Sequence, residues 1–197
     1  KGEDWNLELT HERIERSLRV DALQVFSIGE GVAYGSSVFH YFITGAPVTE
    51  LEIATPSGYA NVEFIGKDVR SWEKTPAGHR CRLHSPQSGA FTLLVTYDLR
   101  FEPSGGLLSL VGARPVGAKV EHGYVIAASH HYSREKGGAG ELLSPHLLEL
   151  EPAEVPADFR LLYDAPLVSA FRYSGRPLDV NLMLRPLDHA ESVRQVA

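Results

Sequence analysis

Cysteine is almost missing from this sequence: Cys81 is the single one among 197 residues, so no disulfide can form within the chain. The sequence also lacks an apolar run of the ~18 residues that a membrane-spanning helix needs. No signal peptide is recognisable. These absences exclude a disulfide framework and predict no membrane insertion by this segment. The remaining composition, 43% hydrophobic and 22% charged, is ordinary for a globular domain.

Basic residues are not in excess, since 19 Lys and Arg stand against 25 Asp and Glu and give a formal net charge of −6. A protein that binds nucleic acid usually presents a basic surface, so we expect no nucleic-acid partner. Gly-x-Gly-x-x-Gly, Walker and Gly-x-Ser-x-Gly motifs are absent as well. We therefore expect no cofactor, and no motif predicts a catalytic serine.

What the sequence does contain is a long series of short alternating segments, separated by Gly, Pro and Ser. They are rich in Val, Ile, Phe, Tyr and Thr, which fit a half-buried pleated surface. This pattern predicts an all-β fold, an antiparallel β-sandwich with at most short helical turns. The predicted strands are Leu18–Phe26, Val38–Thr44, Thr49–Thr55, Asn61–Ile65, Val69–Lys74, Arg80–Ser85, Ala90–Phe101, Leu107–Val111, Gly123–His130, Leu147–Leu150, Phe159–Tyr163, Leu167–Tyr173 and Leu178–Arg185.

The turns between these strands are marked by their residues. Thr55–Gly58 and Thr75–Gly78 each carry Pro early and Gly late, and the second predicts a hairpin. Glu151–Phe159 can hold one helical turn. Apolar periodicity is lost from Arg134 to Ser144, so an internal break between two packed sheets is possible there.

The two ends of the chain resemble each other. Asp4–Val20 and Asp179–Gln195 share six identical residues over seventeen aligned positions without a gap. Self-similarity at a fixed spacing indicates tandem copies of a domain. We therefore expect residues 1–20 to be the tail strand and connector of a preceding copy, and residues 21–197 to form the β-sandwich module of a longer protein. The alternative is a chance match of two amphipathic segments.

One block of the sequence resembles a recurring block of large, uncharacterised bacterial cell-envelope proteins. It runs from "APVTELEIATPSGYANVEFIGKDVRSWE" into "HRCRLHSPQSGAFTLLVTYDL", and its motifs are Gly66, Asp68–Trp72, Pro86, Gly89 and Leu93. The resemblance extends over roughly two thirds of the chain. It implies β-sandwich modules of an exported or membrane-anchored protein, in the periplasm or cell envelope. Neighbouring modules or another envelope protein would be the partners, and no catalytic residue is implied.

His130 and His131 are the first candidates for chemistry, because two adjacent histidines and Tyr132 come shortly before the glycine-rich stretch Lys136–Glu141. Neighbouring side chains on a strand point to opposite faces, so the two histidines cannot ligate one metal without a bulge or turn. We interpret them as the end of a strand, followed by a mobile loop.

His79, Cys81 and His84 are the other candidate metal ligands. Alternation places His79 and Cys81 on one face of a predicted strand, where they offer zinc two ligands, and His84 on the other face. A structural zinc site needs two further ligands, and there is no second cysteine. The competing interpretation makes Cys81 a small, inward-facing apolar residue.

Trp72, Tyr124 and Tyr132 are candidate ligand-binding residues, because exposed aromatic side chains on a sandwich face can stack on sugars. A single Trp at a strand end is more often a plug in the core or at an edge. Exposure of Trp72 beside polar groups favours ligand binding, and burial of Trp72 counts against it.

Three hypotheses for the function follow. The first is a non-enzymatic module that spaces other domains and offers surfaces or edge strands to partners. The second is a β-sandwich that binds a carbohydrate or another small ligand. The third is a metal-dependent enzyme, which requires at least three of the candidate histidines, His122 included, to converge with a supporting second layer of hydrogen bonds.

Overall fold

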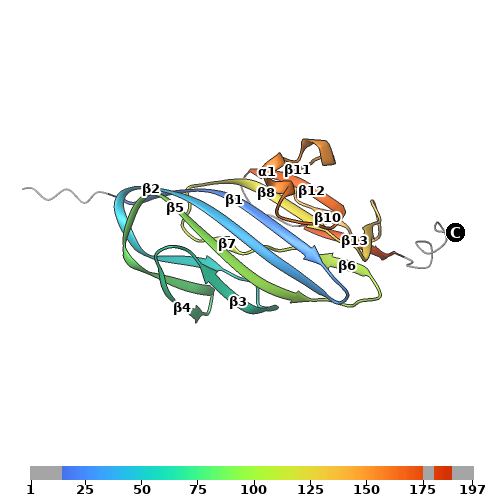
Figure 1. The fold of residues 1–197 in the computed structure, drawn as a ribbon, viewed down its shortest axis with the longest axis horizontal. Helices are drawn as coiled ribbons and strands as arrows, with labels where there is room; N and C mark the ends of the chain where they lie inside the picture. The colour runs from blue at the N-terminus through green and yellow to red at the C-terminus, as the bar shows by residue number, and fades with distance from the viewer. Residues whose placement is uncertain (1–14, 175–179, 188–197) are drawn as a thin grey trace, which may run out of the picture.

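The computed structural model describes residues 15–174 and 180–187. Within these ranges the fold is all-β, as predicted, and consists of a nine-stranded and a four-stranded sheet (Figure 1). Most of the repeat proposed between the two ends lies outside the described residues. Of the described parts, Ser17–Val20 belongs to the first strand of the larger sheet, so the expected module boundary after residue 20 falls within a strand, and Val180–Pro186 forms a strand of the smaller sheet.

The larger sheet has the order β11-β12-β8-β1-β2-β5-β3, with β4 paired to β5 and β7 paired to β2. Its pairs are antiparallel except for β1 with β8, which run parallel and depart from the predicted purely antiparallel pattern. The bounds are β1 Ser17–Ile28, β2 Val32–Ala54, β3 Tyr59–Ile65, β4 Val69–Thr75, β5 Gly78–Arg100, β7 Arg114–Pro115, β8 Val120–Ala128, β11 Leu147–Glu149 and β12 Leu167–Ser174.

The smaller sheet has the order β10-β13-β6, and β9 also pairs with β13. Its strands are β6 Gly106–Ser109, β9 Tyr132–Arg134, β10 Leu142–Leu143 and β13 Val180–Pro186. The predicted break at Arg134–Ser144 falls in the loop between β9 and β10 and at its edges. Strands from before and after this loop pair in each sheet, β6 with β13 and β8 with β12, so both parts of the chain contribute to both sheets.

β2 and β5 form one long antiparallel pair that bends at its middle (Figure 1). The ladder runs from Val32↔Arg100 to Ile43↔Gly89, shifts register around Val48, and resumes at Glu50↔Arg82. Gly45 and Gly89 have φ of 78° and 76° at this bend, a conformation that favours glycine and is typical of β-bulges. The glycines and prolines that predict breaks between Val38–Thr44 and Thr49–Thr55, and between Arg80–Ser85 and Ala90–Phe101, thus bend continuous strands.

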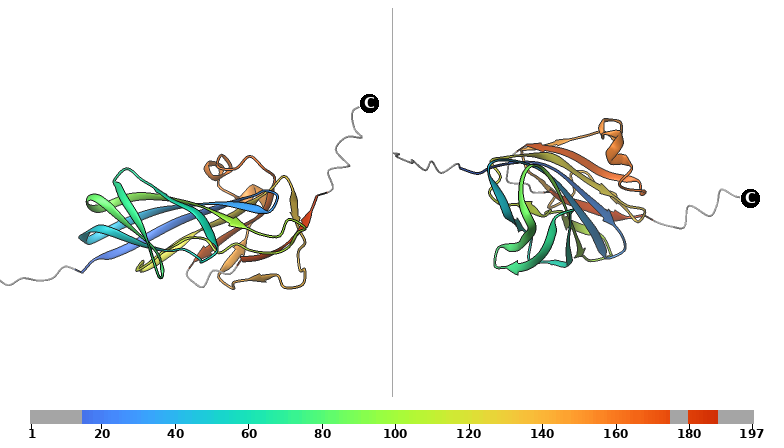
Figure 2. Two further views of the ribbon diagram at one scale, coloured as in Figure 1. Left: turned by 90° about the horizontal axis from the view of Figure 1, so that it is seen from below. Right: turned by 60° about the vertical axis from the view of Figure 1, so that its left-hand side comes forward.

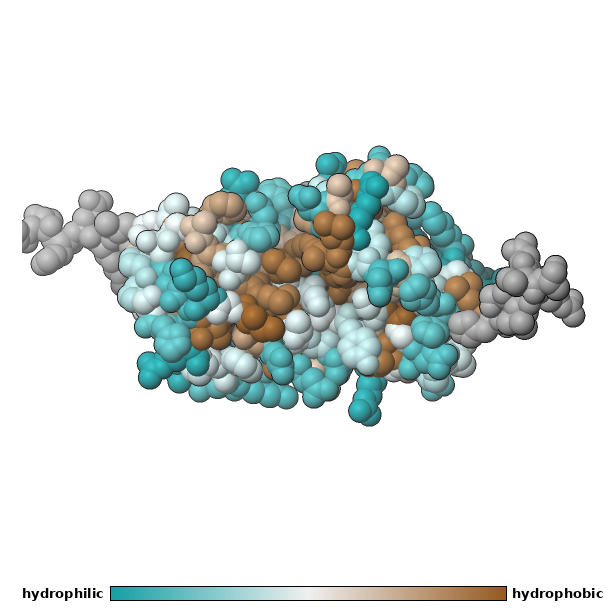
Figure 3. All heavy atoms as spheres, viewed as in Figure 1, coloured by the Kyte–Doolittle hydropathy of each residue, from teal (hydrophilic) through white to brown (hydrophobic). Residues whose placement is uncertain are grey.

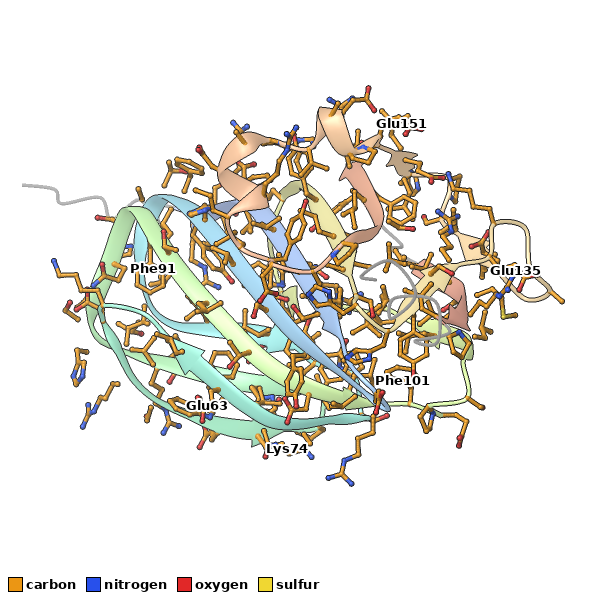
Figure 4. All side chains as sticks on the ribbon, turned by 45° about the vertical axis from the view of Figure 1, so that its right-hand side comes forward. Glu63, Lys74, Phe91, Phe101, Glu135 and Glu151 are labelled. Carbon is orange, nitrogen blue, oxygen red and sulfur yellow. The ribbon has the colours of Figure 1, made fainter. Side chains whose placement is uncertain are left out.

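The bend places the two halves of each strand in opposite layers around one core. The half of β5 from Phe91 to Arg100 pairs with β2 and β3; Phe91 lies at one end of this half and Phe101 directly follows the other end (Figure 4). The other half pairs with β4 through the Thr75–Gly78 hairpin, which confirms that prediction. Side chains from both layers and from the smaller sheet form one buried cluster, which includes Phe39, Leu51, Cys81, Leu108 and Leu182.

Residues 151–163 cover part of the outer face of the larger sheet, on one side of it (Figure 2). This segment holds η1 Pro152–Glu154 and α1 Ala157–Arg160, so the helical turn predicted for Glu151–Phe159 is confirmed. The strand predicted for Phe159–Tyr163 is wrong, because Phe159 instead packs edge-on against Tyr124 of β8 at 5.0 Å. No helix in the described part of the chain is long and apolar enough to cross a membrane.

A buried polar chain ties the layers together. The Tyr97 hydroxyl lies 3.0 Å from Ser37 Oγ and accepts a hydrogen bond from the Ala113 amide at 3.4 Å. The carbonyl of Ala113 accepts a bond of 3.2 Å from Gln24 Nε2. Burial raises the pKa of the Tyr97 hydroxyl, so this group stays neutral and links β1, β2 and β5 to the segment between β6 and β7.

Gly35→Ala should destabilise the fold. A Cβ at position 35 would overlap the ring of Tyr97, which is buried and stacks on Tyr59 at a centroid distance of 4.1 Å. Overpacking of this kind costs about 1–3 kcal/mol. Chemical denaturation should show this loss, whereas Gly58→Ala, which meets only Leu99 at 3.8 Å, should leave the free energy of unfolding nearly unchanged. Equal effects of the two variants would contradict the packing argument.

Candidate functional site

An apolar row crosses five strands on the outer face of the larger sheet. Tyr124 of β8 pairs with Leu23 of β1, Leu23 with Val38 of β2, Val38 with Leu94 of β5, and Leu94 with Ile65 of β3. Residues paired directly across strands lie on the same face of a sheet, so these five side chains stand side by side.

Only one end of this apolar row is covered. Tyr124 and Leu23 pack under the segment of residues 151–163, with Val38 at the margin of that cluster. Farther along, Leu94 is half-buried and Ile65 is 51% exposed. Figure 3 shows apolar atoms gathered near the middle of the face formed by β1, β2 and β5. Contiguous exposed apolar surface of this kind is typical of an interaction site.

Three hollows lie along the same outer face. The first, of about 580 Å³, is lined by residues of β1, β8, β11 and β12. The second, of about 510 Å³, shares Arg19 and Asp21 with the first and extends to Phe42. The third, of about 440 Å³, reaches Ala90 and Leu94, and Ala90 is the cross-strand partner of Phe42. Together the three hollows follow this face from β12 to β3.

The first hollow is positively charged although the chain as a whole is acidic. Its lining includes Arg19, Arg172, His122 and His146, with Asp21 as the one acidic residue among the described lining. The ion pairs of the described residues form elsewhere, around Arg80, Arg82 and Arg134 and at His131 and Lys136, and neither Arg19 nor Arg172 takes part in one. The two guanidinium groups are therefore available to an anionic partner.

His130 and His131 lie in a bend between β8 and β9, where the chain passes from the larger sheet to the smaller one. Buried Ser129 fixes this bend: its hydroxyl donates to the Ile28 carbonyl at 2.7 Å and accepts bonds from the amides of His131 and Tyr132. The prediction that β8 extends to His130 is wrong by two residues, because Ser129 turns the chain at that point.

The glycine-rich loop after β9, which we expected to be mobile, is anchored by an ion pair. Arg134, whose side chain is 4% exposed, donates to Glu141 at 2.7 Å and to Glu149 at 3.0 Å. Its guanidinium also lies 5.5 Å from the centre of the Phe171 ring. The Glu141 carboxylate also accepts a hydrogen bond of 2.9 Å from the Gly137 amide. One carboxylate therefore connects the two ends of the loop and pairs with the buried Arg134 guanidinium.

His79, Cys81 and His84 adopt the predicted alternation but do not assemble a metal site. Cys81 is fully buried in the core, and burial raises the pKa of its thiol to about 11. His79 lies 2.9 Å from the Thr55 hydroxyl, and burial lowers the pKa of its ring. His84 is exposed. Across the described residues there is no group of three or more His, Cys, Asp or Glu side chains able to hold a metal ion.

Trp72, Tyr124 and Tyr132 occupy three different environments. Trp72 is 42% exposed on β4 and packs against Phe64 at 5.8 Å. Tyr124 lies under Phe159, and Tyr132 is buried with its hydroxyl donating to the Pro103 carbonyl at 2.8 Å. The three aromatic rings therefore do not form one platform.

The outer-face hollow was missed by sequence reasoning. Arg19 and Asp21 alternate with buried residues of β1, which places them on one face, but their neighbours come from β8 and β12. Arg172 and His146 stand far from Arg19 in the sequence, and only the order β12-β8-β1 brings them together. Strand order is not encoded in local alternation, so no local signal could have found this group.

The sequence matches no protein-family model and no curated protein. Among solved structures, an M1 zinc metallopeptidase from Deinococcus radiodurans aligns with a TM-score of 0.46 and 14% identity, over 86% of this chain and 42% of that chain. Leukotriene A4 hydrolase from Saccharomyces cerevisiae aligns with a TM-score of 0.41 and 10% identity, over 86% and 29%. The chain thus spans less than half the length of either enzyme.

Glu141→Gln should remove a pH-dependent part of the stability. The hydrogen bond from Arg134 holds the pKa of Glu141 below its usual value, so the ionised carboxylate stabilises the fold above pH ~4.3 and this contribution is lost as pH falls through the lowered pKa. At pH 7 the variant should lose up to ~3 kcal/mol, because buried Arg134 then keeps only the more exposed Glu149 as a charged partner.

Thermal midpoints measured between neutral and acidic pH test this assignment. The difference between wild type and Glu141→Gln should shrink as pH falls, while Glu102→Gln, at an exposed position, should follow the wild type throughout. A difference that stays constant down to low pH would contradict the assigned role of Glu141.

Cys81 should be unreactive in the folded protein. Its thiol is fully buried and has a raised pKa of about 11, so the nucleophilic thiolate is scarce and inaccessible. A colorimetric thiol reagent should modify it slowly in buffer and fast in denaturant. Equally fast modification under both conditions would place Cys81 at the surface, against the structure.

Proposed function

We propose that this chain is a non-enzymatic β-sandwich interaction module of a bacterial exported or membrane-anchored protein. Its partners would be neighbouring modules of the same protein or another envelope protein, outside the cytoplasm. The support for this setting is the resemblance of the Gly66–Trp72 and Pro86–Leu93 motifs to envelope modules. The support for an interaction role comes from the surface of the module.

The single observation that carries the interaction role is the outer face of the larger sheet. The apolar row from Val38 through Leu94 to Ile65 remains uncovered beyond the segment of residues 151–163, and the three hollows follow the same face. A protein interface typically combines an apolar centre with polar residues around it. The outer face offers both over several adjacent strands.

The edges of the larger sheet are poorer binding sites than its face. β4 carries exposed Arg70, Glu73 and Lys74, and charged side chains on an edge strand discourage pairing with another strand. β3 has a register shift between Ala60 and Glu63, and β11 is only three residues long. A partner would therefore dock on the face rather than extend the sheet.

A carbohydrate-binding role remains a second candidate because of one observation. Trp72 is 42% exposed, and charged Lys74, two residues along β4, lies on the same face of the strand. This meets the condition set by the sequence, although Tyr124 and Tyr132 contribute nothing at that place. The described residues do not meet the condition for a metal-dependent enzyme, because no three candidate ligands converge among them.

Site-specific photo-crosslinking in the native cells tests the proposed function. A photoreactive phenylalanine analogue at exposed Phe42 or Ile65 should capture one defined protein, identified by mass spectrometry of the crosslinked peptides. The same analogue at Lys74 on β4 is the matched control and should capture nothing at comparable yield. Crosslinks from Lys74 but not from Phe42 or Ile65 would contradict the proposed surface.

A further inference from the structure

We propose that the first hollow of the outer face binds carboxylate side chains of an acidic, partly apolar peptide segment of the partner. This inference rests on the proposed function and adds the chemistry of the partner. Three observations carry it: the placement of two arginines that form no ion pair with another described residue, the excess of positive charge, and the apolar residues in the same lining.

The arginines stand on two strands that flank β8. Arg19 of β1 is paired with Val120 and Arg172 of β12 with Tyr124, so the two arginines are about 10 Å apart across the sheet and about 13 Å apart along it. A guanidinium group binds a carboxylate through two parallel hydrogen bonds, which gives both strength and orientation. At this separation the two arginines address different carboxylates, as acidic side chains several residues apart on an extended peptide would present them.

The local charge selects an anion. Arg19 and Arg172 face Asp21 alone among the acidic residues of the described lining, and His122 and His146 add ring N–H donors. The chain carries a net charge of −6, which disfavours a long polyanion such as nucleic acid lying across the whole molecule. A short acidic segment satisfies the hollow without meeting the acidic remainder of the surface.

The apolar part of the lining points to a peptide rather than a free anion. Leu148, which is 53% exposed, is the cross-strand neighbour of Arg172, and Tyr124 is the neighbour on its other side. On the other side of the hollow, Phe42, which is 45% exposed, is the cross-strand neighbour of Arg19. A segment in which apolar residues follow acidic ones would place carboxylates at the arginines and apolar side chains against Leu148 or Phe42.

Fluorescence anisotropy with the purified chain tests the inference. The probe is a short labelled peptide in which a run of glutamates is followed by a run of leucines, and the control peptide has glutamine in place of glutamate. The wild type should bind the glutamate probe, more weakly at high salt because exposed charges are screened. The double variant Arg19→Gln/Arg172→Gln should weaken binding by at least ~10-fold.

The matched control is the double variant Arg70→Gln/Arg114→Gln, which removes the same charge from exposed positions on β4 and β7. It should bind the probe like the wild type, and thermal midpoints should show that both double variants fold. Failure of the wild type to bind, equal binding of the glutamine peptide, inhibition by inorganic phosphate at equimolar concentration, or an unaffected Arg19→Gln/Arg172→Gln variant would each overturn the inference.

The two proposals fail in distinguishable ways. In the native cells, crosslinks from Ile65 that persist unchanged in the Arg19→Gln/Arg172→Gln variant overturn the acidic-peptide inference and leave the interaction function in place. Absence of crosslinks from Phe42 and Ile65 in the wild type overturns the interaction function itself, whatever the purified chain does with the peptide.

Discussion

The antiparallel pairing of β2 with β5 through a shared bend is the constraint on which the rest of the structure depends. Both strands are 23 residues long, and Gly45 and Gly89 allow the ladder to turn without ending. One pair of strands therefore supplies the centre of both layers. β1 and β3 pair with this strand pair on one side of the bend, and β4 pairs with it on the other side. The buried chain from Gln24 to Tyr97 and Ser37 then fixes the segment between β6 and β7 against the inner face.

The same arrangement explains why one face stays open. The inner side chains of β1, β2 and β5 fill a single core, so their outer side chains need a second cover. Residues 151–163 provide that cover only at β1, β8 and β12. Val38, Leu94 and Ile65 continue the apolar row beyond it, and a partner that completes the cover would bury surface that the chain itself leaves exposed.

The sequence was sufficient for the fold class and for most strands, because alternation and turn residues are local signals. It failed where one sequence pattern is compatible with two structures. Glycines and prolines can end a strand or bend it, and those near Gly45 and Gly89 bend it. An apolar segment can form a strand or cover a sheet, and Phe159 packs on Tyr124 as part of a cover. The alternation of His79 and Cys81 was predicted, but the basic hollow was not. Arg19 and Arg172 become neighbours only through the strand order β12-β8-β1.

Hydroxyl-radical footprinting of the protein in its cells, compared with the purified chain, tests the central claim most directly. If the outer face is a binding surface, the oxidation of Phe42, Leu94 and Ile65 should fall in cells, while that of Trp72 on β4 should not change. Equal oxidation of Phe42, Leu94 and Ile65 in both samples, with protection of Trp72 instead, would contradict the account and move the binding site to the opposite layer.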